Sequence, residues 1–152
     1  MKKLLVPFCL TLIIFIGSVG GSESADFQKG LKALQKKDYA TALREWKPLA
    51  EQGYAPAQSG LGMMYFSGQG VPKDHKTAVK WYRLAAEQGH LLSQGNLGWI
   101  YYKGIGVSQN HEIALKYHRL VLKNDAANKK QKDLVRGYIK NSEQELKRLN
   151  GK

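Results

Sequence analysis

The sequence predicts an all-α protein, a solenoid built from antiparallel helix pairs. Three observations predict this class: segments that match at intervals of 36 residues, apolar residues at helical spacing within each segment, and glycine-x-glycine pairs between the segments' helices. An internal period of this length is typical of stacked supersecondary units, because each unit buries its apolar face against the next.

Residues 1–25 are predicted to form a cleavable signal peptide. Two lysines follow the first methionine, residues 4–19 form an apolar stretch, and small residues lead to a cleavage point near Ala25. The apolar stretch is a little short for a bilayer span, so an uncleaved anchor is the weaker alternative. We expect an exported bacterial protein, periplasmic or secreted, without a transmembrane segment after cleavage.

The cysteine count and the net charge limit the chemistry of the exported chain. Cys9 is the only cysteine and lies in the signal peptide, so the mature chain has no disulfide, cysteine nucleophile or thiolate metal site. The formal net charge is +12, and removal of Lys2, Lys3 and Glu23 with the signal peptide leaves 12 − 2 + 1 = +11. In an exported chain this charge favours an acidic protein surface or an anionic envelope polymer as partner, rather than nucleic acid. A solvated basic surface without a ligand is the plain alternative.

The repeats are predicted to span 38–125. A half-copy at 38–53, DYATALREWKPLAEQG, matches DHKTAVKWYRLAAEQG at 74–89, and full copies follow at about 54–89 and 90–125. The shared positions that we assign to the repeat architecture are Leu61, Gly62, Tyr65, Gly68 and Gly70, with their equivalents Leu97, Gly98, Tyr101, Gly104 and Gly106.

Each full copy is predicted to be two helices joined by a glycine loop. In the first copy, a helix from Ala55 to Ser67 ends at Gly68, because a left-handed residue after a helix is easily adopted by glycine. Asp74 then caps the second helix. Gly62 lies inside the first helix, where glycine is unfavourable by roughly 1 kcal/mol relative to alanine. We infer that another helix packs against its bare backbone, and likewise at the equivalent glycine of the next copy.

Helical caps are predicted at both ends of the repeats. Residues 26–37 carry apolar side chains at i, i+4 and i+7, which indicates an amphipathic N-terminal helix. Residues 126–152 form a C-terminal helical cap with one apolar stripe. Within this cap, Ser142 and Glu145 have the spacing of a capping box, which predicts that a separate last helix starts there. Such polar-faced ends keep a solenoid soluble.

The sequence identifies no catalytic, metal-binding or cofactor-binding residues. His111-Glu112 resembles the start of a zinc-protease motif, but the next histidine follows after seven residues instead of four. His75 is the equivalent of His111 in the preceding copy, so a two-histidine site is the weaker alternative. The glycine pairs resemble parts of a phosphate loop, yet they follow helices and lack a Gly-Lys-Ser/Thr ending, so we assign them to loop architecture.

The motif A-x-A-Q-x-x-L-G-x-x-Y-x-x-G-x-G-V at 55–71, followed by D-x-x-x-A-x-x-W-Y-x-x-A-A-E-Q-G at 74–89, resembles the Sel-1-like branch of the tetratricopeptide-repeat superfamily. The resemblance covers about 38–125. It implies a right-handed superhelix and a non-catalytic adaptor that holds another protein on its concave face. The last copy departs from the motif, since His118 stands where Tyr82 stands one copy earlier, which suggests that the stack ends there.

Two other functions stay open. Cysteine-rich members of the family that the chain resembles are described as acting on β-lactams, which implies an envelope enzyme. Their cysteine pairs are absent here, and Thr77-Ala-Val-Lys80 is the nearest approach to a Ser-x-x-Lys motif. The second is an immunity-type or inhibitor protein with one dedicated partner.

Positions that differ between the two copies predict the partner-binding face. The spacings of three and four residues place Ser59, Gly60, Met63 and Phe66 on one face of their helix, and Gly95, Asn96, Trp99 and Tyr102 on the equivalent face. Residues that pack in the core recur at the same position in each copy, whereas a ligand contacts each copy differently. Large apolar residues that differ between the copies are therefore better explained by binding. The predicted partner-binding residues are Met63, Phe66, Trp99 and Tyr102, with Lys103 at their rim. The alternative is that Trp99 covers a cap helix.

Overall fold

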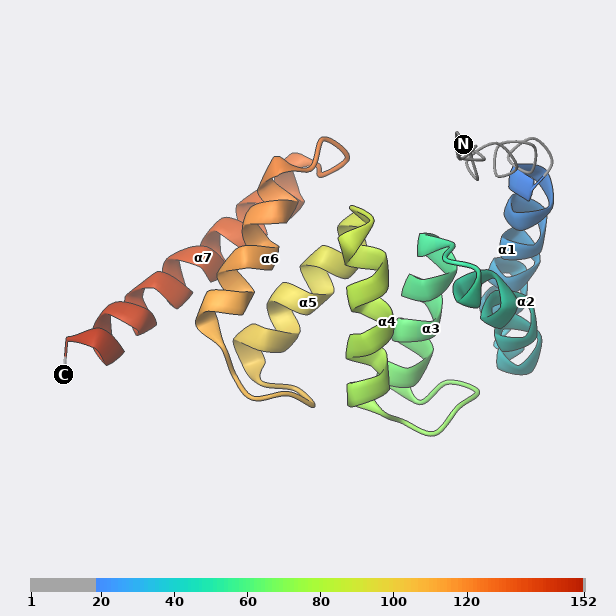
Figure 1. The fold of residues 1–152 in the computed structure, drawn as a ribbon, viewed down its shortest axis with the longest axis horizontal. Helices are drawn as coiled ribbons and strands as arrows, with labels where there is room; N and C mark the ends of the chain where they lie inside the picture. Colours follow the sequence, from blue (N-terminus) through green and yellow to red (C-terminus); the bar gives the residue numbers. More distant parts are fainter. Residues whose placement is uncertain (1–18, 152) are drawn as a thin grey trace, which may run out of the picture.

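A computed structural model describes residues 19–151, with side chains from residue 25 onward. This part of the chain contains α-helices and no strand: α1 (Val19–Gln35), α2 (Tyr39–Glu51), α3 (Ala55–Ser67), α4 (His75–Glu87), α5 (Leu91–Lys103), α6 (His111–Lys123) and α7 (Lys129–Asn150). The helices follow one another in a row from α1 to α7 (Figure 1). The prediction of an all-α helical solenoid is confirmed.

The expected signal peptide lies outside the described residues as far as residue 18. Its last residues form the beginning of α1, so the expected cleavage point near Ala25 falls within this helix. Among the helices that the structure describes, none combines the length and the apolar character needed to cross a bilayer.

The three second helices, α2, α4 and α6, begin in the same way. The side chains of Asp38, Asp74 and Asn110 each accept a hydrogen bond from a backbone N–H in the first turn. Gly68 and Gly104 end α3 and α5 in the left-handed conformation, with φ of 73° and 71°. These caps satisfy backbone groups that would otherwise lack partners, and they fix where each helix pair turns.

Glycines inside α3 and α5 lie against aromatic rings of the second helices. A Cβ atom on Gly62 would lie 2.6 Å from Cδ1 of Tyr82, and one on Gly98 would lie 2.3 Å from Cδ2 of His118. A side chain at either glycine would therefore displace a ring that is almost fully buried. Trp46, at the equivalent position of α2, lies in the same way against Gly30 of α1, where a Cβ atom would lie 2.2 Å from its Nε1.

The loop after each first helix covers the start of the preceding second helix. A Cβ on Gly70 would lie 2.6 Å from Cβ of Tyr39, and one on Gly106 would lie 2.3 Å from Cβ of His75. His111, the next equivalent residue, is covered by α7 instead, where Ser142 Oγ lies 3.3 Å from its Nδ1. The described residues contain no group of three or more histidine, cysteine, aspartate or glutamate side chains placed to hold a metal ion.

The C-terminal cap is one continuous helix, and the predicted start of a separate helix at Ser142 is wrong. Ser142 lies in the interior of α7 and is fully buried, because it packs against the beginning of α6 at His111. The capping box occurs earlier: the Asn128 side chain accepts from the Gln131 N–H, and the Gln131 side chain accepts from the Asn128 N–H.

Candidate functional site

Two adjoining hollows lie on the side of the molecule formed by α1, α3, α5 and α7. The first, of about 530 Å³, is lined mainly by α1, α3 and the beginning of α5. The second, of about 270 Å³, lies between α5 and α7. Both are lined by Leu92 and Asn96, so they form one continuous surface, which we call the inner groove. α1, α3 and α5 therefore line a single hollow although they belong to three successive helix pairs.

The face that the sequence predicted is divided between the two hollows. Ser59, Gly60 and Met63 of α3 line the first hollow. The equivalent residues of α5, Gly95, Asn96 and Trp99, line the second. The six positions therefore lie along one groove, with the two copies contributing to different parts of it.

Phe66 and Tyr102, the other two large predicted residues, lie one turn beyond the hollows. Phe66 contacts Trp99 in an edge-on arrangement, with ring centroids 6.1 Å apart, and it also packs against His75 at 4.7 Å. Met63, Phe66 and Trp99 are half-buried and pack against the core of the second and third helix pairs. Each of these side chains thus combines a contribution to packing with an accessible edge.

Tyr102 and Lys103 lie at the C-terminal end of α5. The Tyr102 ring packs against Tyr138 of α7 at 5.3 Å and against His111 at 5.7 Å. Lys103 is exposed, and its Nζ lies 5.3 Å from the centre of the Tyr102 ring. Tyr102 is therefore partly covered by the C-terminal cap, in the way that the alternative interpretation proposed for Trp99.

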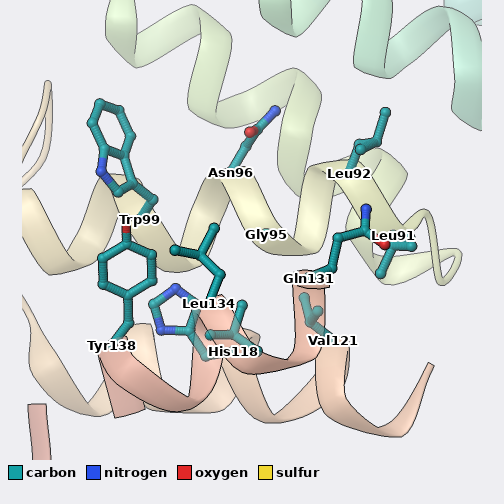
Figure 2. Close-up of a pocket in the computed structure, with 11 residues that line it drawn as sticks. Leu91, Leu92, Gly95, Asn96, Trp99, His118, Val121, Gln131, Leu134 and Tyr138 are labelled. Atoms are coloured by element: carbon teal, nitrogen blue, oxygen red, sulfur yellow. The ribbon is translucent and has the colours of Figure 1, made fainter. Parts of the chain in front are cut away.

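The wall contributed by α7 was not part of the predicted site. Leu134 and Tyr138 project from α7 toward α5, and Tyr138 points toward Trp99 (Figure 2). Val135 of the same helix is buried and also lines the hollow. Leu134 and Leu92 are both 59% exposed, so each offers an apolar surface to solvent at the second hollow. The apolar stripe on residues 126–152 was visible in the sequence, but its position opposite α5 depends on tertiary packing.

His118 forms part of the same hollow and is the most unusual polar residue in it. Its side chain is fully buried, and neither ring nitrogen has a hydrogen-bond partner among the described residues. The ring stacks on Tyr138, with centroids 5.2 Å apart. Burial lowers the pKa of His118 to about 4, so the imidazole is neutral at pH 7.

The aromatic residues at the equivalent positions have partners for their polar atoms. Trp46 Nε1 donates to the backbone oxygen of Phe27 at 3.1 Å, and the Tyr82 side chain is hydrogen-bonded to Asn96. The third copy therefore differs from the first two in having a buried polar ring without a protein partner. Buried polar groups are normally hydrogen-bonded, so the imidazole without a partner among the described residues distinguishes the second hollow from the first.

Thr77 belongs to a helix cap. Its hydroxyl donates to the Asp74 carboxylate at 2.6 Å, and the same carboxylate accepts from the Thr77 backbone N–H. Asp74 has its pKa lowered mainly by these hydrogen bonds with Thr77. The residue nearest to a Ser-x-x-Lys nucleophile is thus oriented by an acidic capping residue at the start of α4.

Comparison with known proteins gives one family. The family model of the Sel1 repeat matches residues 55–90 and 91–120. A solved Sel1 repeat protein from Oxalobacter formigenes is similar at 33% identity and a TM-score of 0.67, over 78% of this chain and 90% of that protein. No curated protein matches the chain.

A second solved structure is a protective antigen of uropathogenic Escherichia coli strains with an SLR fold. The similarity has 37% identity and a TM-score of 0.65, and it covers 68% of this chain. The chain spans 23% of the antigen's length, so the two proteins share a segment of repeats rather than their whole extent.

Proposed function

The chain belongs to the Sel1 repeat family, and we propose that it is an exported, non-catalytic scaffold that binds another protein along the inner groove. Sel1 repeats are typical of protein-interaction scaffolds. The observation that carries the proposal is the continuous apolar groove across α1, α3, α5 and α7, with two exposed leucines at its α5–α7 end. Exposed leucines that gather at one hollow are typical of an interaction surface.

The dimensions of the groove fit a protein segment that inserts apolar side chains. Its hollows, about 530 and 270 Å³, are of the size that accepts one or a few side chains, and repeat solenoids present such elongated surfaces to extended partners. Trp99 stands in the second hollow as an aromatic anchor, the residue class that contributes most to binding energy. Without Lys2, Lys3 and Glu23 of the signal peptide, the formal net charge is +11 (12 − 2 + 1), which favours a partner with an acidic surface.

The proposal of export rests on the N-terminal sequence. The lysine pair, the apolar stretch and the small residues before Ala25 together have the pattern of a cleavable signal. A partner would then be an envelope or extracellular protein.

Paired leucine substitutions test the groove. Leu92→Asp with Leu134→Asp places charge in the groove, and Leu84→Asp with Leu149→Asp is the matched control, because these leucines are also exposed but do not line either hollow. Crosslinking of the mature protein in envelope extract, followed by mass spectrometry, should identify a partner that the groove variant loses and the control retains. Equal loss in both variants, with folding intact by circular dichroism, would place the binding surface elsewhere.

A further inference from the structure

A row of positive side chains crosses the second helices on the side that faces away from the inner groove. The row has two members in each copy, three residues apart: Arg44 and Lys47 in α2, Lys80 and Arg83 in α4, and Lys116 and Arg119 in α6. All six are exposed. In α4, Tyr82 points into the groove, and the two cations lie roughly 100–160° around the helix from it. We call these six residues the outer basic row.

The charge of the row is kept between copies although its residues change. Arg44 is a lysine in the next two copies, and Lys47 is an arginine in both. The exposed positions one turn away carry both signs in different copies, as with Lys76 and Glu112. Packing selects for a particular side-chain shape, whereas binding of an anion selects for charge. The row therefore presents one pair of positive charges in each of the three copies, which is the arrangement that a repeating polyanion can match.

Two members of the row are held in place by buried aromatic rings. Arg83 Nη2 donates to the hydroxyl of Tyr101 at 2.9 Å, and Lys116 Nζ lies 5.7 Å from the centre of the Tyr117 ring. Tyr101 and Tyr117 are buried and stack on each other, with centroids 6.2 Å apart. This pair of rings links the cations of α4 and α6, so less side-chain freedom is lost when both bind one ligand.

The ion pairs at the two ends of the row are open to exchange. Arg44 pairs with Glu45 and Arg119 with Glu143, each at 3.0 Å, and both arginine side chains are more than half exposed. Exposed pairs of this kind contribute little to stability. A ligand with several carboxylates can replace the glutamates, because arginine binds carboxylates through two parallel hydrogen bonds.

We propose that the outer basic row binds a flexible linear polyanion, a carboxylated polysaccharide laid across the repeats. The row lies on the side of the second helices away from the two hollows and crosses three helices, so a flexible chain can follow it from one copy to the next. The rings that contact the row, Tyr101 and Tyr117, are buried and offer no platform on which nucleic-acid bases could stack. The site is separate from the inner groove, so this inference does not depend on the proposed function.

Matched charge variants test the row. The row variant carries Lys47→Gln, Lys80→Gln and Lys116→Gln, one substitution in each copy. The control carries Lys129→Gln, Lys130→Gln and Lys140→Gln, which removes the same charge from exposed positions of α7. Binding of polygalacturonate is measured by isothermal titration calorimetry at about 50 mM salt, where screening is weak. The row variant should bind roughly tenfold more weakly, since three exposed contacts are lost, and the control should change less than about threefold.

Chain length and competing polyanions complete the experiment. Trigalacturonate, whose three carboxylates cannot engage all six cations of the row, should bind far more weakly than the polymer. The proposal is overturned if wild-type protein does not bind polygalacturonate, or if the row and control variants lose equal affinity. Tighter binding of single-stranded DNA or of anionic lipid vesicles, with the same dependence on the row, would also overturn it by assigning the row to another class of partner.

Discussion

Two glycines of α5, three residues apart, should respond in opposite ways to the same substitution. A Cβ on Gly95 would meet no atom within 4 Å, whereas a Cβ on Gly98 would lie 2.3 Å from Cδ2 and 2.5 Å from Nε2 of His118. The imidazole cannot easily move away, because its ring stacks on Tyr138 of α7. Gly95→Ala and Gly98→Ala therefore compare an open position with a closed one in a single helix.

The expected magnitudes follow from helix propensity and packing. Alanine is favoured over glycine inside a helix by roughly 0.8–1.0 kcal/mol, so Gly95→Ala should raise the free energy of unfolding by up to about 1 kcal/mol. The same gain applies at Gly98, but overpacking a filled site typically costs about 1–3 kcal/mol. At a separation of 2.3 Å, we expect the packing cost to exceed the propensity gain, so that Gly98→Ala destabilises by up to about 2 kcal/mol.

Urea denaturation followed by circular dichroism measures both effects. A double-mutant cycle with His118→Ser tests the cause: if the clash with the imidazole is responsible, Gly98→Ala should cost at least about 1 kcal/mol less in the His118→Ser background. If Gly98→Ala instead stabilises the protein as much as Gly95→Ala, α6 does not approach α5 closely enough for the His118 ring to clash with a side chain at position 98.

Three further predictions concern acid stability, partner capture and export. Burial lowers the pKa of His118 to about 4, so the unfolded chain binds a proton there before the folded protein does. The free energy of unfolding should therefore fall as pH drops from about 6.5 to 4, by up to about 3 kcal/mol more than in His118→Phe. Equal losses of stability in urea titrations of both proteins would contradict this. Trp99→Ala with Phe66→Ala should abolish partner capture while the helical circular-dichroism signal is retained, whereas an unfolded double variant would assign both rings to the core. N-terminal sequencing of protein from the envelope fraction should find a first residue between Ser22 and Phe27, and protein that still begins at Met1 would refute cleavage.

The features of the fold that could be predicted from the sequence are those that depend on neighbouring residues in the chain. The caps at Asp74 and Gly68 depend on short-range backbone geometry, and they recur at the same intervals as the repeat. The Ser142 error has the opposite origin. A serine followed three residues later by glutamate has the pattern of a helix start, but the contact between Ser142 and His111 involves residues 31 positions apart. The inner groove likewise combines local and long-range features. The faces of α3 and α5 that line it follow from residue spacing within each helix, whereas the position of α7 opposite α5 depends on tertiary packing.

The C-terminal cap completes both the fold and the groove. A solenoid that ends on an unpaired second helix leaves apolar surface open, and α7 covers this surface. Ser142 of α7 lies against His111 at the start of α6. One copy earlier, the equivalent residue His75 is covered by Gly106 of the loop after α5. The same helix places Tyr138 against His118 and Tyr102, and Leu134 beside the second hollow. Tyr138 and Ser142 are fixed by this packing, whereas Leu134 is 59% exposed and belongs to a helix that lacks the repeat motif. Under the proposed function, we therefore expect the α7 end of the groove, with its exposed Leu134, to contribute to partner specificity.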